Sequence, residues 1–307
     1  MERYSHSGTV TASGLLLMPL AGLVTAGVLA VVYSVIIVHV PFIYANFLAT
    51  AAFGFATGYT IGRAAKIGKI RNPLVAGLFG LVFGLVGLYI AWAADFIIRF
   101  ELPQDDYLVA FRPGMLSEYI AVFYDQGFWG FSEKSNVSGL LLAAIWLVEA
   151  GVIVGLAMLT AHAATAKLTF CERCQTWNQV VEDVRRLAIG PGQESVIERL
   201  ATGNLSALKD LTVASPETSV YLRVDMAQCQ TCSDSSYVTV QLVTETVDKD
   251  GDVSTDTDAL LTNVLVTEAE LIELQEAGQP APEGEPDVGT TMEQLDQGPT
   301  DDPRFEG

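Results

Sequence analysis

The sequence has little positive charge and few of the residues that enzymes commonly use for catalysis. Its 307 residues include 17 lysines and arginines against 36 aspartates and glutamates, a net charge of −19. Nucleic-acid-binding proteins need a basic surface, so we expect no nucleic-acid partner. Only three histidines occur, at positions 6, 39 and 162, and none stands in a recognisable nucleophile–histidine–acid set. We therefore expect that the protein is not an enzyme.

Charge is also scarce overall and unevenly distributed along the chain. Charged residues make up 17% of the sequence, below the roughly 25% that is usual for soluble domains. Residues 1–166 contain 8 basic and 9 acidic side chains, whereas residues 167–307 contain 9 and 27. This contrast predicts a short N-terminal segment at 1–13, a membrane domain at 14–166, and an acidic region that faces water. The acidic, lysine-poor second half is typical of a bacterial or archaeal protein.

Four stretches are long and apolar enough to cross a lipid bilayer. Residues 14–38 and 41–61 carry no charge, and residues 73–98 and 139–161 carry one acid each. Since about 20 helical residues span a hydrocarbon core ~30 Å thick, the sequence predicts a four-helix transmembrane bundle. The first stretch is longer than the roughly 7–15 apolar residues of a signal peptide, so we expect it to be retained.

The loops between these stretches predict the orientation. The link between the second and third stretches carries Arg63, Lys66, Lys69 and Arg71 and no acid. Because basic residues accumulate in cytoplasmic loops, we expect a cell (inner) membrane protein with both termini in the cytoplasm. The 40-residue loop 99–138 then lies outside.

This outer loop contains a helical pattern of its own. Pro113 is followed by apolar residues at helical spacing and then by Gly127, which together indicate where a short amphipathic helix starts and stops. We expect that helix to lie on the bilayer surface, with a ligand- or partner-binding lid as the alternative.

Glycines recur at helical spacing in three of the four stretches. Small residues at such spacing let two helices approach closely. Their partner is either another helix of the same bundle or a second copy of the chain, which would make a homo-oligomer. The glycines are Gly54, Gly58 and Gly62, then Gly80 and Gly84, and finally Gly151 and Gly155.

One acid lies deep inside a predicted span. Glu149 is the eleventh residue of the stretch 139–161, and no lysine, arginine or histidine lies at a similar depth in the other spans. A charge there costs ~2.5–3.5 kcal/mol on insertion scales. We expect Glu149 to be protonated, hydrogen-bonded to Thr25, Tyr33 or Thr50, or facing a water-filled cavity. The functional alternative is a proton or cation site, and a contact across an oligomer seam is also open.

The most specific signal is a pair of cysteine motifs, Cys171-x-x-Cys174 and Cys229-x-x-Cys232. Two intervening residues let both thiolates of one turn reach a metal ion, and two such turns supply a tetrahedral zinc site. The pairs resemble the knuckles of a zinc ribbon, although 54 residues separate them, against roughly 15–20 in compact zinc motifs. We expect one structural zinc ion per chain. Disulfides, a redox dithiol, iron or free thiols are the alternatives.

The sequence around the cysteines predicts a small cytoplasmic α+β domain at residues 167–278. Residues 237–247 and 253–266 indicate a long hairpin, and Thr267-x-x-Glu270 is a capping box at the start of a helix. From 279 to 307 the chain is rich in proline, glycine and acids, a composition typical of a disordered tail.

Three functions fit these patterns. The first is a membrane anchor or scaffold that presents the zinc-stabilised domain to an unknown cytoplasmic protein partner. The second is a small ion- or proton-conducting component that uses Glu149, and the third is a thiol-redox membrane protein. The absence of catalytic residues favours the first.

Overall fold

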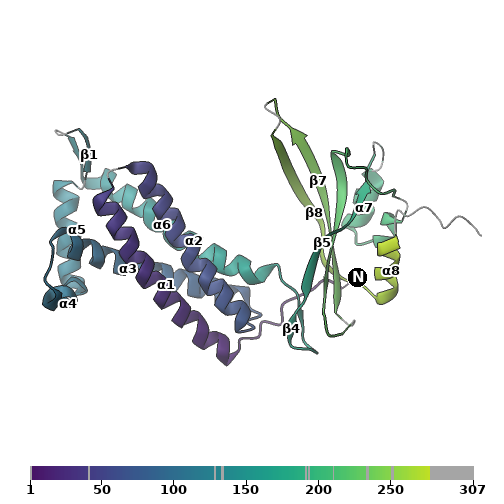
Figure 1. Ribbon diagram of the computed structural model, residues 1–307, viewed down its shortest axis with the longest axis horizontal. Coiled ribbons are helices and arrows are strands. Elements are labelled where there is room, and N and C mark those ends of the chain that lie inside the picture. The colour runs from purple at the N-terminus through teal and green to yellow at the C-terminus, as the bar shows by residue number, and fades with distance from the viewer. Residues whose placement is uncertain are drawn as a thin grey trace, which may run out of the picture.

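The protein forms a long helical bundle followed by a smaller domain built on a four-stranded sheet (Figure 1). This computed structural model describes residues 2–40, 42–127, 129–132, 135–190, 192, 194–209, 211–232, 235–249 and 252–276. The acidic tail expected at 279–307 lies outside the described residues.

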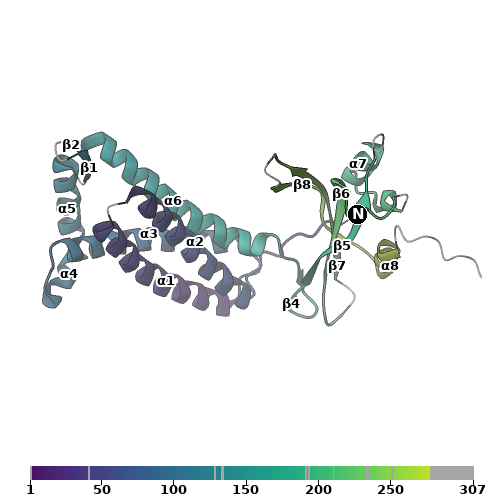
Figure 2. The same cartoon turned by 45° about the horizontal axis from the view of Figure 1, so that its top comes forward.

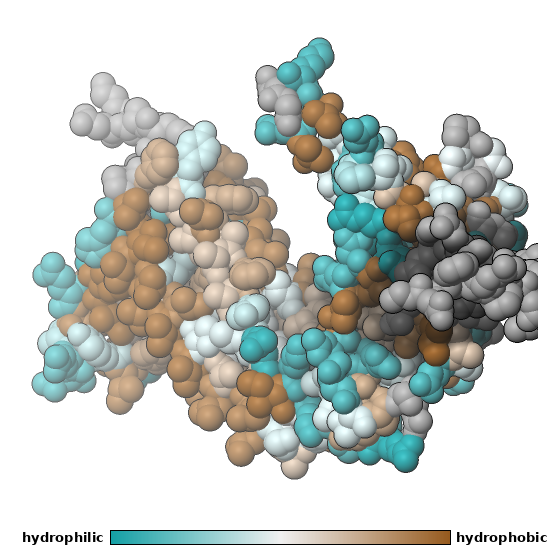
Figure 3. All heavy atoms as spheres, turned by 45° about the vertical axis from the view of Figure 1, so that its right-hand side comes forward, coloured by the Kyte–Doolittle hydropathy of each residue, from teal (hydrophilic) through white to brown (hydrophobic). Residues whose placement is uncertain are grey.

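The bundle consists of α1 (Ala12–His39), α2 (Ile43–Ile67), α3 (Pro73–Arg99) and α6 (Gly139–Ala166). By length and composition, α1, α3 and α6 are apolar enough to cross a membrane. In their most apolar windows only 22%, 33% and 17% of the residues are buried inside the protein. Figure 3 shows the resulting apolar surface beside the more hydrophilic surface of the sheet domain. So large an exposed apolar surface is typical of contact with lipid or another protein.

Glycines of α2 and α3 let these helices pack tightly against α6. A Cβ added to Gly54 would lie 2.5 Å from the Ile153 carbonyl oxygen. Gly58 and Gly80 both meet the backbone of Ala157 at still closer range. These glycines therefore lie against a helix of the same chain.

The end of the bundle away from the sheet is capped by short elements between α3 and α6 (Figure 2). The predicted amphipathic helix is confirmed as α5, and Gly127 follows it with a φ of +89°. Tyr119 of α5 is buried, and its ring stacks on Phe96 of α3 at a centroid distance of 4.8 Å. The elements are η1 (Gln104–Asp106), α4 (Tyr107–Ala110), α5 (Pro113–Gln126), β1 (Trp129–Ser132) and β2 (Ser135–Val137).

The smaller domain is an antiparallel sheet in the order β5-β6-β7-β8. Three short helices pack on its face away from the bundle (Figure 1). The predicted hairpin is confirmed as β7 and β8, and the capping box precedes α8, with the Thr267 amide donating to Glu270 Oε2 at 2.8 Å. The strands are β5 (Gln179–Ala188), β6 (Val220–Gln228), β7 (Ser236–Val247) and β8 (Val253–Leu265), and the helices are α7 (Glu194–Ala201), η2 (Leu205–Leu208) and α8 (Glu268–Glu276).

The hydrophobic core of this domain lies between the sheet and these helices. Alternate strand residues such as Leu222 and Val238 point toward the helices, where they meet Leu200 of α7 and Leu208 of η2. Period-two alternation along the strands places these side chains on one face. The polar residues between them form the opposite face, where Arg223 donates to Gln241 Oε1 at 2.7 Å.

The N-terminal segment connects the two parts of the molecule. The Leu265 amide donates to the Glu2 carbonyl and the Tyr4 amide to the Asn263 carbonyl, at 2.9 and 2.8 Å, so residues 2–4 pair with one end of β8. Further along, Thr11 caps α1 by accepting from the Gly14 amide at 3.2 Å. The segment therefore runs from the edge of the sheet to the beginning of the bundle.

Candidate metal centre

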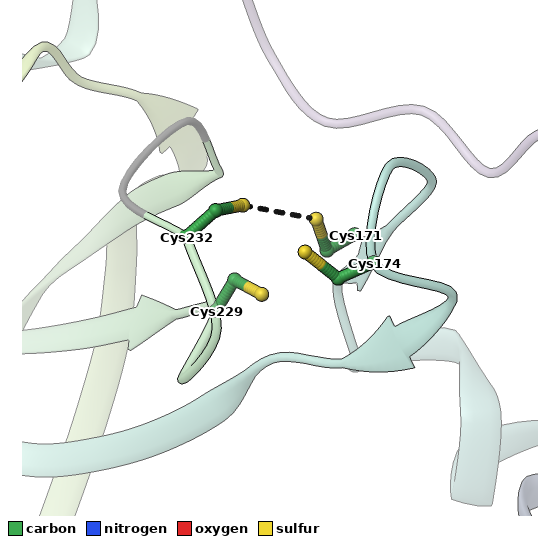
Figure 4. A group of neighbouring side chains, drawn as sticks. All are labelled: Cys171, Cys174, Cys229 and Cys232. Carbon is green, nitrogen blue, oxygen red and sulfur yellow. Dashed lines mark hydrogen bonds between the residues drawn. The ribbon is translucent and has the colours of Figure 1, made fainter.

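The two cysteine pairs occupy two turns that face each other at the end of the sheet domain nearest the bundle (Figure 4). Cys171 ends β3 (Phe170–Cys171), which pairs with β4 (Thr176–Trp177), and Cys174 lies in the turn between these strands. Cys229 and Cys232 follow β6 directly. The 54 intervening residues include β5, α7, η2 and β6, whose antiparallel pairing returns the chain to the first turn.

The four sulfur atoms point toward a common centre. All four Sγ atoms lie within 4.8 Å of one another, and the Cys171 and Cys232 sulfurs are 3.6 Å apart. Cys171 and Cys229 are buried, whereas Cys174 and Cys232 are half-buried. The four cysteines are free thiols. This arrangement could hold one metal ion, with every ligand supplied by a thiolate.

A buried polar network joins the chain segments beside the two turns. The Asn178 side-chain amide donates to Thr169 Oγ1 at 2.9 Å and to Ser235 Oγ at 3.0 Å. Thr169 precedes the first cysteine pair and Ser235 follows the second. Asn178 is only 5% exposed, so a buried side chain links the segment before the first cysteine pair to the segment after the second. The sequence analysis did not predict this network. The only indication in the sequence is that an Asn, a Thr and a Ser lie within a few residues of the two cysteine motifs.

The environment shifts the thiol pKa values in opposite directions. The backbone amide of Thr231 donates to the Cys229 sulfur and lowers the pKa of Cys229 to about 6. Burial raises the pKa of Cys171, and a hydrogen bond with the Cys232 sulfur raises the pKa of Cys174 to about 12. Cys229 therefore loses its proton more readily than Cys171 and Cys174, whose protons a bound metal would displace.

The structure places Glu149 far from this centre, inside the bundle on α6. Its side chain is half-buried, and Tyr33 of α1 lies near enough to interact with it electrostatically. Thr50 of α2 donates to the Asn46 carbonyl of its own helix at 2.8 Å. Among the described residues, no hydrogen bond or ion pair reaches the Glu149 carboxylate, so the bonds expected from Thr25, Tyr33 or Thr50 are not formed.

The seven glycines separate into two groups. Gly54, Gly58, Gly62, Gly80 and Gly84 lie against α6 of the same chain. In the part of the chain that the structure describes, no atom lies within 4 Å of a Cβ placed on Gly151 or Gly155. This second pair lies on a part of α6 that no other described element covers.

Comparison of the chain with protein-family models, curated proteins and solved structures finds no match. The function is therefore argued from two features of the chain itself. These are three helices apolar enough to cross a membrane and a cysteine cluster that could hold a metal ion.

Proposed function

We propose that this protein is an integral membrane anchor or scaffold that presents a zinc-stabilised cytoplasmic domain to a protein partner. The convergence of four cysteine sulfurs within 4.8 Å of one another carries this proposal. Four thiolates at ~2.3 Å from zinc would lie about 3.8 Å apart in a tetrahedron, which matches the 3.6 Å between Cys171 and Cys232. A zinc ion with four protein ligands has no open position for a substrate, so its role is structural.

We infer that α2 is a fourth membrane span, although it is less apolar than α1, α3 and α6. Two of its polar residues, Thr50 and Thr57, are buried inside the bundle. Its outward face is apolar and aromatic, with Phe47, Leu48 and Phe55 exposed. In a membrane, polar residues on the inner face and apolar residues on the lipid face give a stable span.

The sidedness of the molecule supports a cytoplasmic position for the metal domain. The basic α2–α3 loop and the sheet domain lie at one end of the bundle, and α4 and α5 lie at the other (Figure 2). Because basic loops stay in the cytoplasm, the cysteines would occupy a reducing compartment. There metal ligation is favoured over disulfide formation.

Metal analysis of the full chain in detergent tests the proposal. We expect one zinc per chain, and native thiols that react only after a strong chelator is added. Structural zinc contributes on the order of 10 kcal/mol, comparable with the ~5–15 kcal/mol net stability of a domain. Cys171→Ser and Cys229→Ser should therefore each abolish the cooperative melting of the sheet domain. A metal-free chain with four reactive thiols and unchanged melting would favour the thiol-redox function instead.

A second candidate function, movement of a proton or cation through the bundle, is supported by the position of Glu149 beside Tyr33. Intramembrane acids often serve such roles. Flux into liposomes should be measured for the full chain and for Glu149→Gln. A flux that the Gln variant loses, while the fold and the metal content remain, would replace the anchor with a transport function.

A further inference from the structure

One basic side chain of the α2–α3 loop is buried against the first cysteine turn. Arg71 is only 4% exposed, although it lies in a loop at the end of the bundle. Its guanidinium carbon stacks over the Phe170 ring at 4.4 Å from the centroid. Its Nη1 donates to Gln175 Oε1 at 3.2 Å, and its Nε forms an ion pair with Glu172 Oε1 at 3.4 Å.

A second contact joins the same two regions. The Trp177 indole Nε1 donates to the Lys66 backbone carbonyl at 2.8 Å, and the Trp177 ring packs edge-on against Phe170 at 5.0 Å. On the bundle side, the Arg71 amide donates to the Thr9 carbonyl at 2.9 Å. The α2–α3 loop is thus held between the N-terminal segment and the first cysteine turn.

The metal-domain residues that make these contacts with Arg71 and Lys66 are Phe170, Glu172, Gln175 and Trp177, which belong to one segment, 170–177. This segment is the β3–β4 hairpin, and Cys171 and Cys174 belong to it. Its ladder has only two residue pairs, Phe170 with Trp177 and Cys171 with Thr176. A hairpin this short is not stable in water by itself, so ligation of its two cysteines would supply the missing order.

We propose that metal binding at the four cysteines latches the cytoplasmic domain to the bundle through Arg71. The bound metal orders the β3–β4 hairpin, and the ordered hairpin then holds the Arg71 guanidinium and the Lys66 carbonyl. Loss of the metal releases the α2–α3 loop. The coupling is reciprocal, so loss of the Arg71 contacts weakens metal retention. The latch rests on the proposed metal site. It adds that metal binding changes whether the α2–α3 loop of the bundle is held by the β3–β4 hairpin.

The test compares Arg71→Lys with Arg63→Lys in the full chain, purified in detergent and loaded with zinc. Lysine keeps the positive charge and the trypsin cleavage site at position 71, but it lacks the planar fork that stacks on Phe170. Arg63 is exposed on α2, so Arg63→Lys is the matched control. Two rates are measured, zinc transfer to a chromophoric chelator and tryptic cleavage after residue 71.

With zinc bound, the wild-type chain and Arg63→Lys should resist cleavage after residue 71, because trypsin cannot reach a buried side chain. Arg71→Lys should bind one zinc yet be cleaved there about tenfold faster or more, because each hydrogen bond to a charged group shifts an equilibrium by roughly that factor. It should also lose zinc to the chelator about tenfold faster. Removing zinc from the wild-type chain should raise its cleavage to the Arg71→Lys level.

The outcomes separate the latch from the metal site. A wild-type chain that takes up no zinc overturns both. A chain that binds one zinc, but in which Arg71→Lys matches the wild type in cleavage and in zinc transfer, overturns the latch and leaves the metal site intact. Equal effects of Arg63→Lys and Arg71→Lys would also overturn it, because the cause would then be the general charge of the loop.

Discussion

Replacement of Gly54 by alanine tests whether close approach of α2 and α6 holds the bundle together. The new Cβ would lie 2.5 Å from the Ile153 carbonyl oxygen and 2.9 Å from the Ile153 Cα. Ordinary contacts begin near 3.4 Å, and both obstructing atoms belong to the backbone, so no side-chain rotation relieves the clash. The two helices would have to separate by roughly 1 Å, and the packing along both would loosen.

The expected cost follows from two opposing effects. Overpacking of this kind costs about 1–3 kcal/mol, whereas replacing glycine by alanine inside a helix stabilises it by about 0.5–1 kcal/mol. The net destabilisation is then about 1 kcal/mol at the central values, within a range of about 0–2.5 kcal/mol. For a bundle of this size, the central value corresponds to a fall of roughly 2–4 °C in the melting temperature.

Gly151→Ala is the matched control, because it makes the same change on α6 where no described atom lies within 4 Å. Both variants would be heated in detergent, and the folded fraction measured by size-exclusion chromatography. Gly54→Ala should melt at a lower temperature and Gly151→Ala at an unchanged or higher one. Equal destabilisation by the two would refute the reasoning. A shift of Gly151→Ala to a smaller assembly would instead show that this glycine lies in a homo-oligomer seam.

Three further predictions concern the metal, the topology and a helix cap. Zinc binding at pH 7 should release at least about two protons, because Cys171 and Cys174 have raised pKa values and must ionise to bind the metal. Calorimetry in buffers of different ionisation enthalpy measures the number of protons released. In intact cells, a membrane-impermeant thiol reagent should label a cysteine introduced at Ser117 of α5 but not one introduced at Ser254 of β8. Thr267→Ala should cost about 0.5–2 kcal/mol in the unfolding of the sheet domain, measured by chemical denaturation.

Each of these predictions has a distinct contrary result. Zinc binding without proton release would mean that the thiols are already ionised or that other groups bind the metal. Labelling at position 254 but not at 117 would reverse the orientation and favour disulfides over zinc. A Thr267→Ala variant of unchanged stability would mean that the bonds between Thr267 and Glu270 add nothing to α8.

The contribution of these bonds to the stability of the sheet domain should fall on acidification. The Thr267 amide lowers the pKa of Glu270, and protonation of that carboxylate weakens the bonds.

The sequence predicted the elements whose causes are local. The length of the stretches with no charge or one acid predicted the long apolar helices, of which the structure confirms three. The hairpin predicted over residues 237–247 and 253–266 is β7–β8, and Pro113 and Gly127 marked the limits of α5. Cysteine spacing predicted two turns able to share one ion, and the structure brings all four sulfurs together. These patterns work because a few neighbouring residues decide each of them.

The tertiary structure decided which distant residues meet. In the sequence, Arg71 is one of four similar basic residues, and its burial against Gln175 depends on a contact across 104 positions. Glycine spacing shows that a helix can be approached closely, but not by which helix. Gly54 lies against α6, whereas Gly151 faces no described part of the chain. Local chemistry determines what each segment can do, and the packing of the whole chain determines which of those capacities are used.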